Sequence, residues 1–114
     1  MDEAAREALD HIVSALRPLL EQHGFRRAQA MDDQPAYGGT FRVVFAAGEE
    51  AVRFVWDSDG RYIVLEALEP ESGGAWTDML LKRIDLDHTT EAELAYLVEI
   101  LEEELRVYFE QVGA

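Results

Sequence analysis

Apolar residues recur with helical spacing in the first part of the chain. Between residues 5 and 20 they return every three or four positions, which indicates one buried stripe of an amphipathic helix. Gly24 follows this stripe and suits the left-handed conformation that ends a helix, with Phe25 as the apolar residue beside the cap. Pro18 lacks a backbone N–H, so we expect the helix to kink or restart around residues 16–17.

The middle of the chain alternates apolar and polar residues with a period of two, as half-buried strands do. Gly48-Glu49 fits a two-residue type II′ turn, and Asp59-Gly60 fits a second two-residue turn between apolar runs. Together these turns predict one register for an antiparallel meander. That register gives the sheet an apolar face made of Phe41, Val43, Phe45, Val52, Phe54, Trp56, Ile63 and Leu65.

Residues 76–86 fit either a strand or a helical turn, and we favour a fourth strand over residues 79–85. From residue 94 to 112 the apolar positions again have helical spacing, and Thr90 and Glu93 before them form a capping box. Residues 28–40 read as a loop. The predicted fold is α+β: a helix, a three- to four-stranded antiparallel meander and a helix, with both helices on one sheet face.

The composition narrows the class of protein. A chain of 114 residues is expected to form a single domain over residues 1–114. The absence of cysteine excludes disulfides, thiolate catalysis and cysteine-ligated metals. No apolar stretch approaches the roughly 20 residues of a membrane helix, and the acidic N-terminus does not resemble a signal peptide. We therefore expect a cytoplasmic protein with no membrane partner.

Charge is concentrated at the C-terminal end of the chain. The net charge is −14, and residues 85–114 contribute nine acidic residues and one basic residue, a net −8. Such a field repels nucleic acid and attracts a basic protein. The polar side of the last predicted helix carries Glu104 together with four acids that we expect to contact such a partner: Glu99, Glu102, Glu103 and Glu110.

Two acidic stretches are candidate cation sites. In DSDG, Asp57 and Asp59 fit the first positions of an EF-hand loop, but Arg61 stands at the fifth position and Leu68 at the twelfth, where ligands are required. In DLDHTTE, residues 85–91, the carboxylates could bind a hard cation, although strand-to-helix connections are also rich in Asp and Thr. We expect a turn in the first stretch and no metal in either.

The sequence contains no recognisable catalytic arrangement. Its serines lack the G-x-S-x-G context, and its glycine pairs lack the Lys and helix entry of a phosphate loop. Tyr37, Trp56 and Trp76 could line a small pocket, but aromatic residues beside a sheet more often belong to a core. We expect a protein that is not an enzyme and has no cofactor.

The second face of the predicted sheet is a further candidate surface. If both helices cover the first face, a small apolar patch ringed by charge is open to solvent on the second, and such patches often mark contacts. A two-fold dimer through this patch would bring each Arg53 near the Glu66 of its partner, so we expect weak self-association. The patch consists of Val44, Val55, Tyr62 and Val64.

Residues 16–27, LRPLLEQHGFRR, end a helix with Gly-Phe-basic and lead into a loop and a meander. This order resembles small bacterial α+β proteins of the DUF4304 and immunity-protein kind, and the resemblance rests on Leu16, Leu20, Gly24, Phe25 and Arg26. It implies a non-enzymatic, immunity-protein-like module that neutralises or holds a basic protein, such as a nuclease toxin.

Two alternatives stay open. The stretch FRVVFAAGEEAVRFVWDSDGRYIVLEA, with an amphipathic helix on each side, is similar to the central hairpins of acidic type III secretion chaperone-like domains. This resemblance implies binding of an effector segment instead of a toxin. The other alternative is an uncharacterised small-ligand-binding domain. A ligand bound between Trp56 and Trp76 would instead favour an enzyme.

Overall fold

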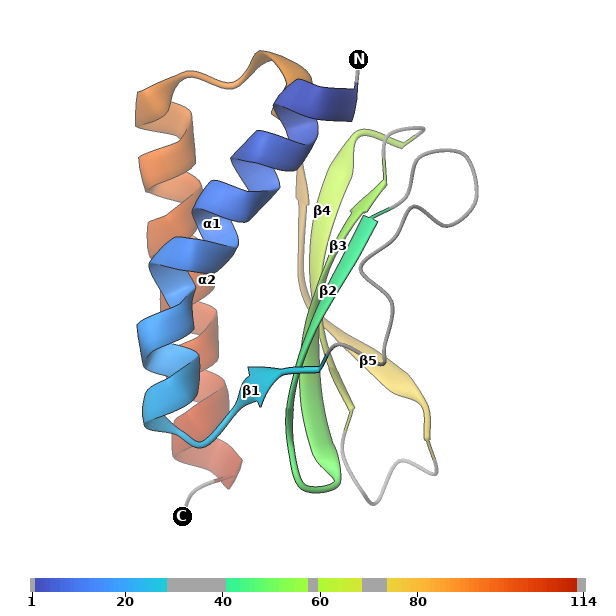
Figure 1. The fold of residues 1–114 in the computed structure, drawn as a ribbon, viewed down its shortest axis with the longest axis vertical. Helices are drawn as coiled ribbons and strands as arrows, with labels where there is room; N and C mark the ends of the chain where they lie inside the picture. The colour runs from blue at the N-terminus through green and yellow to red at the C-terminus, as the bar shows by residue number, and fades with distance from the viewer. Residues whose placement is uncertain (1, 29–40, 58–59, 69–73, 113–114) are drawn as a thin grey trace.

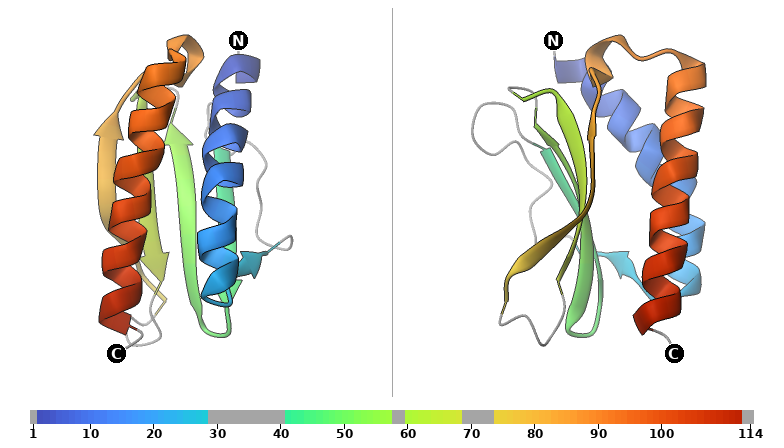
Figure 2. Two further views of the ribbon diagram at one scale, coloured as in Figure 1. Left: turned by 90° about the vertical axis from the view of Figure 1, so that its left-hand side faces the viewer. Right: turned by 180° about the vertical axis from the view of Figure 1, so that it is seen from behind.

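The computed structural model describes residues 2–28, 41–57, 60–68 and 74–112. Within these residues a five-stranded antiparallel sheet, in the order β1-β2-β3-β4-β5, is covered on one face by both helices (Figures 1 and 2). The elements are α1 (Asp2–Gln22), β1 (Arg26–Arg27), β2 (Phe41–Ala47), β3 (Glu50–Asp57), β4 (Tyr62–Leu68), β5 (Trp76–Arg83), the 3₁₀ turn η3 (Leu86–His88) and α2 (Glu91–Val112). The predicted α+β fold, with both helices on one sheet face, is confirmed.

Helix α1 ends as the sequence predicts. The N–H of Phe25 donates to the carbonyl of Leu20 at 2.9 Å, and the N–H of Gly24 donates to Glu21 at 3.0 Å. With Gly24 at φ 84°, these bonds form a Schellman cap. Of the kink or restart expected at Pro18, the restart is wrong, because α1 is continuous through this residue. Pro18 and Ser14 lie on the exposed side, where water can reach the carbonyl that Pro18 leaves without a donor.

The register of strands β2, β3 and β4 is the predicted one. Phe45 lies opposite Val52, and Phe54 lies opposite Leu65, so the apolar face is continuous over the three strands. Gly48 has φ 63° in the two-residue turn between β2 and β3, as a type II′ turn requires of its first central residue.

The turn between β3 and β4 differs from the prediction. Gly60 lies outside the left-handed region, and Arg61 has φ 52° instead. Asp57 and Tyr62 are the last strand partners before the turn among the described residues. The Asp57 carboxylate accepts the N–H of Gly60 at 3.1 Å and thereby stabilises the turn. Asp59 lies outside the described residues.

One strand corrects the predicted count of three to four, and another corrects a predicted boundary. Arg26 and Arg27 form β1 beside β2, which makes five strands within the described residues. The last strand spans Trp76–Arg83 and not residues 79–85, so most of the ambiguous segment is strand. A bulge at Met79 explains the ambiguity. Met79 and Leu80 both pack against the core, and this interrupts the period of two.

The core lies between the sheet and the two helices. Trp56, Phe45 and Phe54 are its largest fully buried side chains, and every apolar stripe residue predicted for α1 is buried with them. Each large apolar side chain removed from water contributes about 1.5–3 kcal/mol. No helix in the described part of the chain is both long enough and apolar enough to cross a membrane.

Candidate functional site

The outer side of α2 carries the acids predicted to bind a partner. Glu99, Glu103 and Glu110 are exposed, whereas Glu102 is half-buried. Arg106 donates to the Glu102 carboxylate from Nη2 at 3.0 Å and from Nε at 3.2 Å. The positive charge of Arg106 therefore compensates the negative charge of Glu102. The carboxylates of Glu99, Glu103 and Glu110 are therefore exposed to solvent and form no ion pair within the described residues.

Helix α1 adds acids to the same layer, which the sequence analysis missed. Glu3, Glu7 and Asp10 are exposed on α1, and α1 lies beside α2 on one side of the sheet (Figure 2). Their spacing of three and four residues on the polar side of an amphipathic helix was a usable signal. The sequence alone did not indicate that the two helices are neighbours. They are neighbours because both pack on the same face of the sheet.

A groove separates the beginning of α1 from the beginning of α2. It encloses about 530 Å³, and its acidic residues are Glu7, Asp87 and Glu91, with His11 beside them. The Asp87 Oδ1 atom is buried and has no hydrogen-bond partner among the described residues. The groove thus continues the acidic layer from one helix to the other. Its full lining is Ala4, Glu7, Ala8, His11, Leu86, Asp87, Thr89, Glu91 and Leu94.

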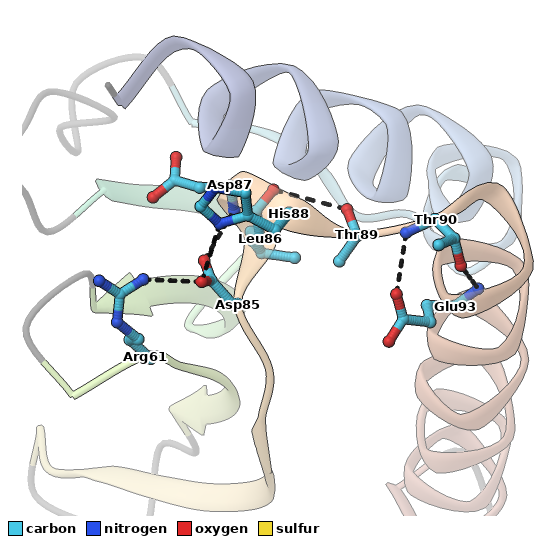
Figure 3. A network of polar contacts seen from close by, with 8 residues as sticks. All are labelled: Arg61, Asp85, Leu86, Asp87, His88, Thr89, Thr90 and Glu93. Carbon is cyan, nitrogen blue, oxygen red and sulfur yellow. Dashed lines mark hydrogen bonds and ion pairs between the residues drawn. The ribbon is translucent and has the colours of Figure 1, made fainter.

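Side chains of the DLDHTTE stretch form hydrogen bonds and ion pairs within the chain (Figure 3). Asp85 Oδ2 accepts from Arg61 Nη1 at 2.8 Å and lies 3.0 Å from His88 Nδ1, while its Oδ1 accepts the N–H of Asp87 at 3.1 Å. The hydrogen bond with His88, then the N–H of Asp87 and the charge of Arg61, lower the pKa of Asp85. Within the described residues no group of three or more acidic or histidine side chains is arranged to hold a metal ion.

The adjacent start of α2 is capped reciprocally (Figure 3). The N–H of Glu93 donates to Thr90 Oγ1 at 3.1 Å, and the N–H of Thr90 donates to Glu93 Oε1 at 2.9 Å. This is the predicted capping box, and it satisfies a backbone donor that the helix leaves unpaired. The polar residues between β5 and α2 therefore serve the connection itself.

The expectation that the second sheet face is open is wrong at two positions. Val44 and Val64 are only 3% and 5% exposed, while Val55 and Tyr62 are half-buried. Val44 lies opposite Arg53 on β3, and Val64 lies between Val55 and Leu81 on the same face.

The dimer predicted through this face also loses its ion pair. Arg53 Nε donates to Glu66 Oε1 within the same chain, at 2.5 Å. Neither side chain therefore needs the partner that the dimer was expected to supply. Self-association through this face stays a prediction, with a smaller apolar patch and no free charges at Arg53 and Glu66 to support it.

The same face contains a polar cluster, of which the sequence indicated Arg53 and Glu66 but not Trp76 and Asp78. Arg53 lies over the indole ring of Trp76, and Glu66 lies opposite Asp78 on β5. Burial, followed by a side-chain hydrogen bond with Asp78, raises the pKa of Glu66, although Arg53 opposes that rise. The register between β4 and β5 depends on the bulge, so alternation alone did not align these residues.

The two tryptophans do not form a shared binding site. Trp56 is fully buried on the helix-covered face, whereas Trp76 is half-buried and lies under Arg53 on the other face. A ligand held between them would have to pass through the sheet, so a ligand placed between these two tryptophans is excluded, while small-ligand binding in general stays a prediction. Tyr37 lies outside the described residues.

The chain matches no family model, and comparison with curated proteins and with solved structures found no match. The resemblances to immunity proteins and to secretion chaperones therefore stay predictions.

Proposed function

We propose that the protein is a non-enzymatic binding module that holds a basic protein partner against the outer side of its helical layer. One observation carries the proposal: Glu99, Glu103 and Glu110 are exposed together on α2, whose single cation, Arg106, is already paired with Glu102. The acids of α1 and the groove at Glu7 and Glu91 extend this surface.

Physical chemistry favours a protein partner over a small ion. Exposed carboxylates spread along two helices lack the convergent oxygens that a cation site requires. They do produce an extended negative potential, which steers a positively charged protein surface toward them and strengthens binding at low salt. Lysine and arginine side chains can then reach several carboxylates at once, and the interaction weakens as salt screens it. We favour an immunity-type role, in which the partner is a basic toxin.

A matched pair of charge reversals tests the proposal. Glu103→Lys changes the outer side of α2, and Glu49→Lys makes the same charge change at the exposed turn between β2 and β3. Each purified protein is used as bait in quantitative affinity capture at low and moderate salt. We expect a basic protein to be enriched by the wild type and by Glu49→Lys, and lost with Glu103→Lys.

The reconstituted pair is then measured with purified components. A dissociation constant that Glu103→Lys raises by about tenfold or more, with Glu49→Lys near the wild type, supports the proposal. Equal effects of the two substitutions would contradict it, because they would show only a dependence on total charge. Capture of no basic protein also contradicts it.

A further inference from the structure

The edge of the molecule formed by β5 and α2 is unlike the rest of its surface. Within the described residues β5 pairs only with β4, so its other side is an edge of the described sheet, and α2 lies in front of it (Figure 2, left). The large exposed apolar side chains of the described residues are Leu81 on β5 and Tyr96 and Val107 on α2, with 50%, 55% and 38% of their surface accessible. Exposed apolar groups beside a free edge are typical of an interaction surface.

The seam between β5 and α2 is hollow at both ends. The hollow near the end of β5 is about 440 Å³ in volume, with Lys82 and Tyr96 in its wall. The hollow near the start of β5 is about 260 Å³, with Glu104 and Val107 in its wall. Glu104 is the one charged residue in the wall of the second hollow, whereas Arg83, Asp85 and Glu93 line the first hollow together with Lys82.

The two ends are complementary when the edge meets itself. A two-fold axis through the middle of β5 places the end of one strand against the start of the other, since paired copies run antiparallel. Lys82 then approaches the partner subunit's Glu104, and Tyr96 approaches the partner subunit's Val107. Neither Lys82 nor Glu104 forms an ion pair inside the described part of its own chain, where the Lys82 ammonium lies over the ring of Tyr96 at 5.7 Å from its centroid.

The bulge in β5 permits this arrangement. Met79 and Leu80 both turn toward the core. In both directions from this pair, the side chains of β5 therefore alternate between the two sheet faces in the same order. An axis at that point sets Thr77 opposite the partner's Lys82, with both on the helix-covered face. A bulge and a lysine normally discourage pairing of an edge with an arbitrary strand. A second copy of this chain has the same bulge at the matching position, and it places the partner subunit's Glu104 near Lys82.

We propose that the β5–α2 edge is the docking site for a second copy of this chain, in a two-fold dimer with Lys82 against the partner subunit's Glu104. The net charge of each chain opposes association, but at physiological salt it is screened beyond about 8 Å, whereas the two ion pairs act at contact. The exposed acids Glu99, Glu103 and Glu110 are outside the two hollows, so the dimer does not depend on the proposed binding of a basic protein.

Charge reversal and mixing test this dimer. Sedimentation is measured over a concentration series at moderate salt for the full chain, Lys82→Glu and Glu104→Lys. We expect the wild type to self-associate and each variant to raise the dimer dissociation constant by about tenfold or more, because each creates two like-charge contacts. An equimolar mixture of the two variants restores both ion pairs and is expected to associate like the wild type.

Matched controls separate this edge from the rest of the surface. Arg26→Glu makes the same charge change as Lys82→Glu on β1, at the opposite edge of the sheet, and is expected to dimerise like the wild type. Circular dichroism confirms that every variant is folded. A wild type that stays monomeric overturns the proposal, as does a dimer unaffected by Lys82→Glu or a mixture that associates no better than its components.

Discussion

The guanidinium of Arg53 lies over the indole ring of Trp76, with 4.0 Å between Cζ and the ring centroid. The same guanidinium bonds the half-buried carboxylate of Glu66 on the neighbouring strand. One cation thus connects β3, β4 and β5 across the face that the helices leave uncovered.

Removal of this cation is expected to destabilise the fold. Arg53→Ala deletes the cation–π contact and leaves Glu66 without its opposite charge, so we expect the free energy of unfolding to fall by about 1–3 kcal/mol. Urea denaturation measures the change. Arg17→Ala is the control, because its exposed bond to Glu21 should be worth less than about 0.5 kcal/mol. Equal losses in the two variants would show that the stacked geometry adds nothing.

The Glu66 carboxyl is expected to make stability depend on pH. Burial raises its pKa above the ordinary value of 4.5, so the folded chain holds a proton that the unfolded chain has already released. As pH rises from that ordinary value through the folded pKa, the free energy of unfolding contributed by Glu66 therefore falls. Chemical denaturation across mildly acidic pH should show this decline in the wild type and a smaller one in Glu66→Gln. The same slope in both would contradict the assignment.

Gly60 is expected to be required by its neighbour Tyr62. A Cβ added at Gly60 would lie 2.4 Å from a ring carbon of Tyr62, whose hydroxyl donates to Asp57 at 3.0 Å. Gly60→Ala must therefore displace the ring and break that bond, which should cost about 1–3 kcal/mol. In a Tyr62→Ala background the same substitution has no ring to displace. A double-mutant cycle measured by thermal unfolding should show this coupling, and additive effects would disprove it.

Phe54 is expected to be among the most sensitive core positions. It is fully buried in the middle of the sheet, with its ring edge-on to Phe45 at 6.3 Å. Phe54→Ala should lower the free energy of unfolding by about 3–5 kcal/mol, measured by urea denaturation. Leu81→Ala is the control, because Leu81 is half exposed. A loss below about 1 kcal/mol at Phe54 would show that the helix-covered face has been wrongly assigned.

Much of the fold was predictable because its signals are local. The glycine that caps α1, the capping box of α2 and the Gly48 turn each depend on residues only a few positions apart. The register of β3 and β4 was also predicted correctly although their turn was not, since a long alternating run specifies which residues face the core.

The candidate surfaces were predicted less completely, because they depend on contacts between distant segments. The acids of α2 follow from its sequence, but their continuation onto Glu7 of α1 requires knowing that the helices are neighbours. The burial of Val44 and Val64 does not follow from the alternation of the strands, which places both on the face that the helices leave uncovered. The bulge at Met79 moved Trp76 and Asp78 into alignments that a strict period of two does not produce.

The order of the strands in the sheet is the order of the strands in the chain. Each hairpin from β2 to β5 therefore closes only a short loop, at a small cost in conformational entropy. The contact between α1 and α2 is different, because Gln22 and Glu91 are separated by the entire sheet-forming segment. Folding of this protein is thus expected to be limited by the late docking of its two terminal helices, while the meander itself assembles quickly from neighbouring hairpins.

Stopped-flow refolding of Leu16→Ala in α1 and of Val55→Ala in the meander would distinguish these steps. A larger loss of folding rate at Leu16, for equal loss of stability, would show that α1 docks early and not late.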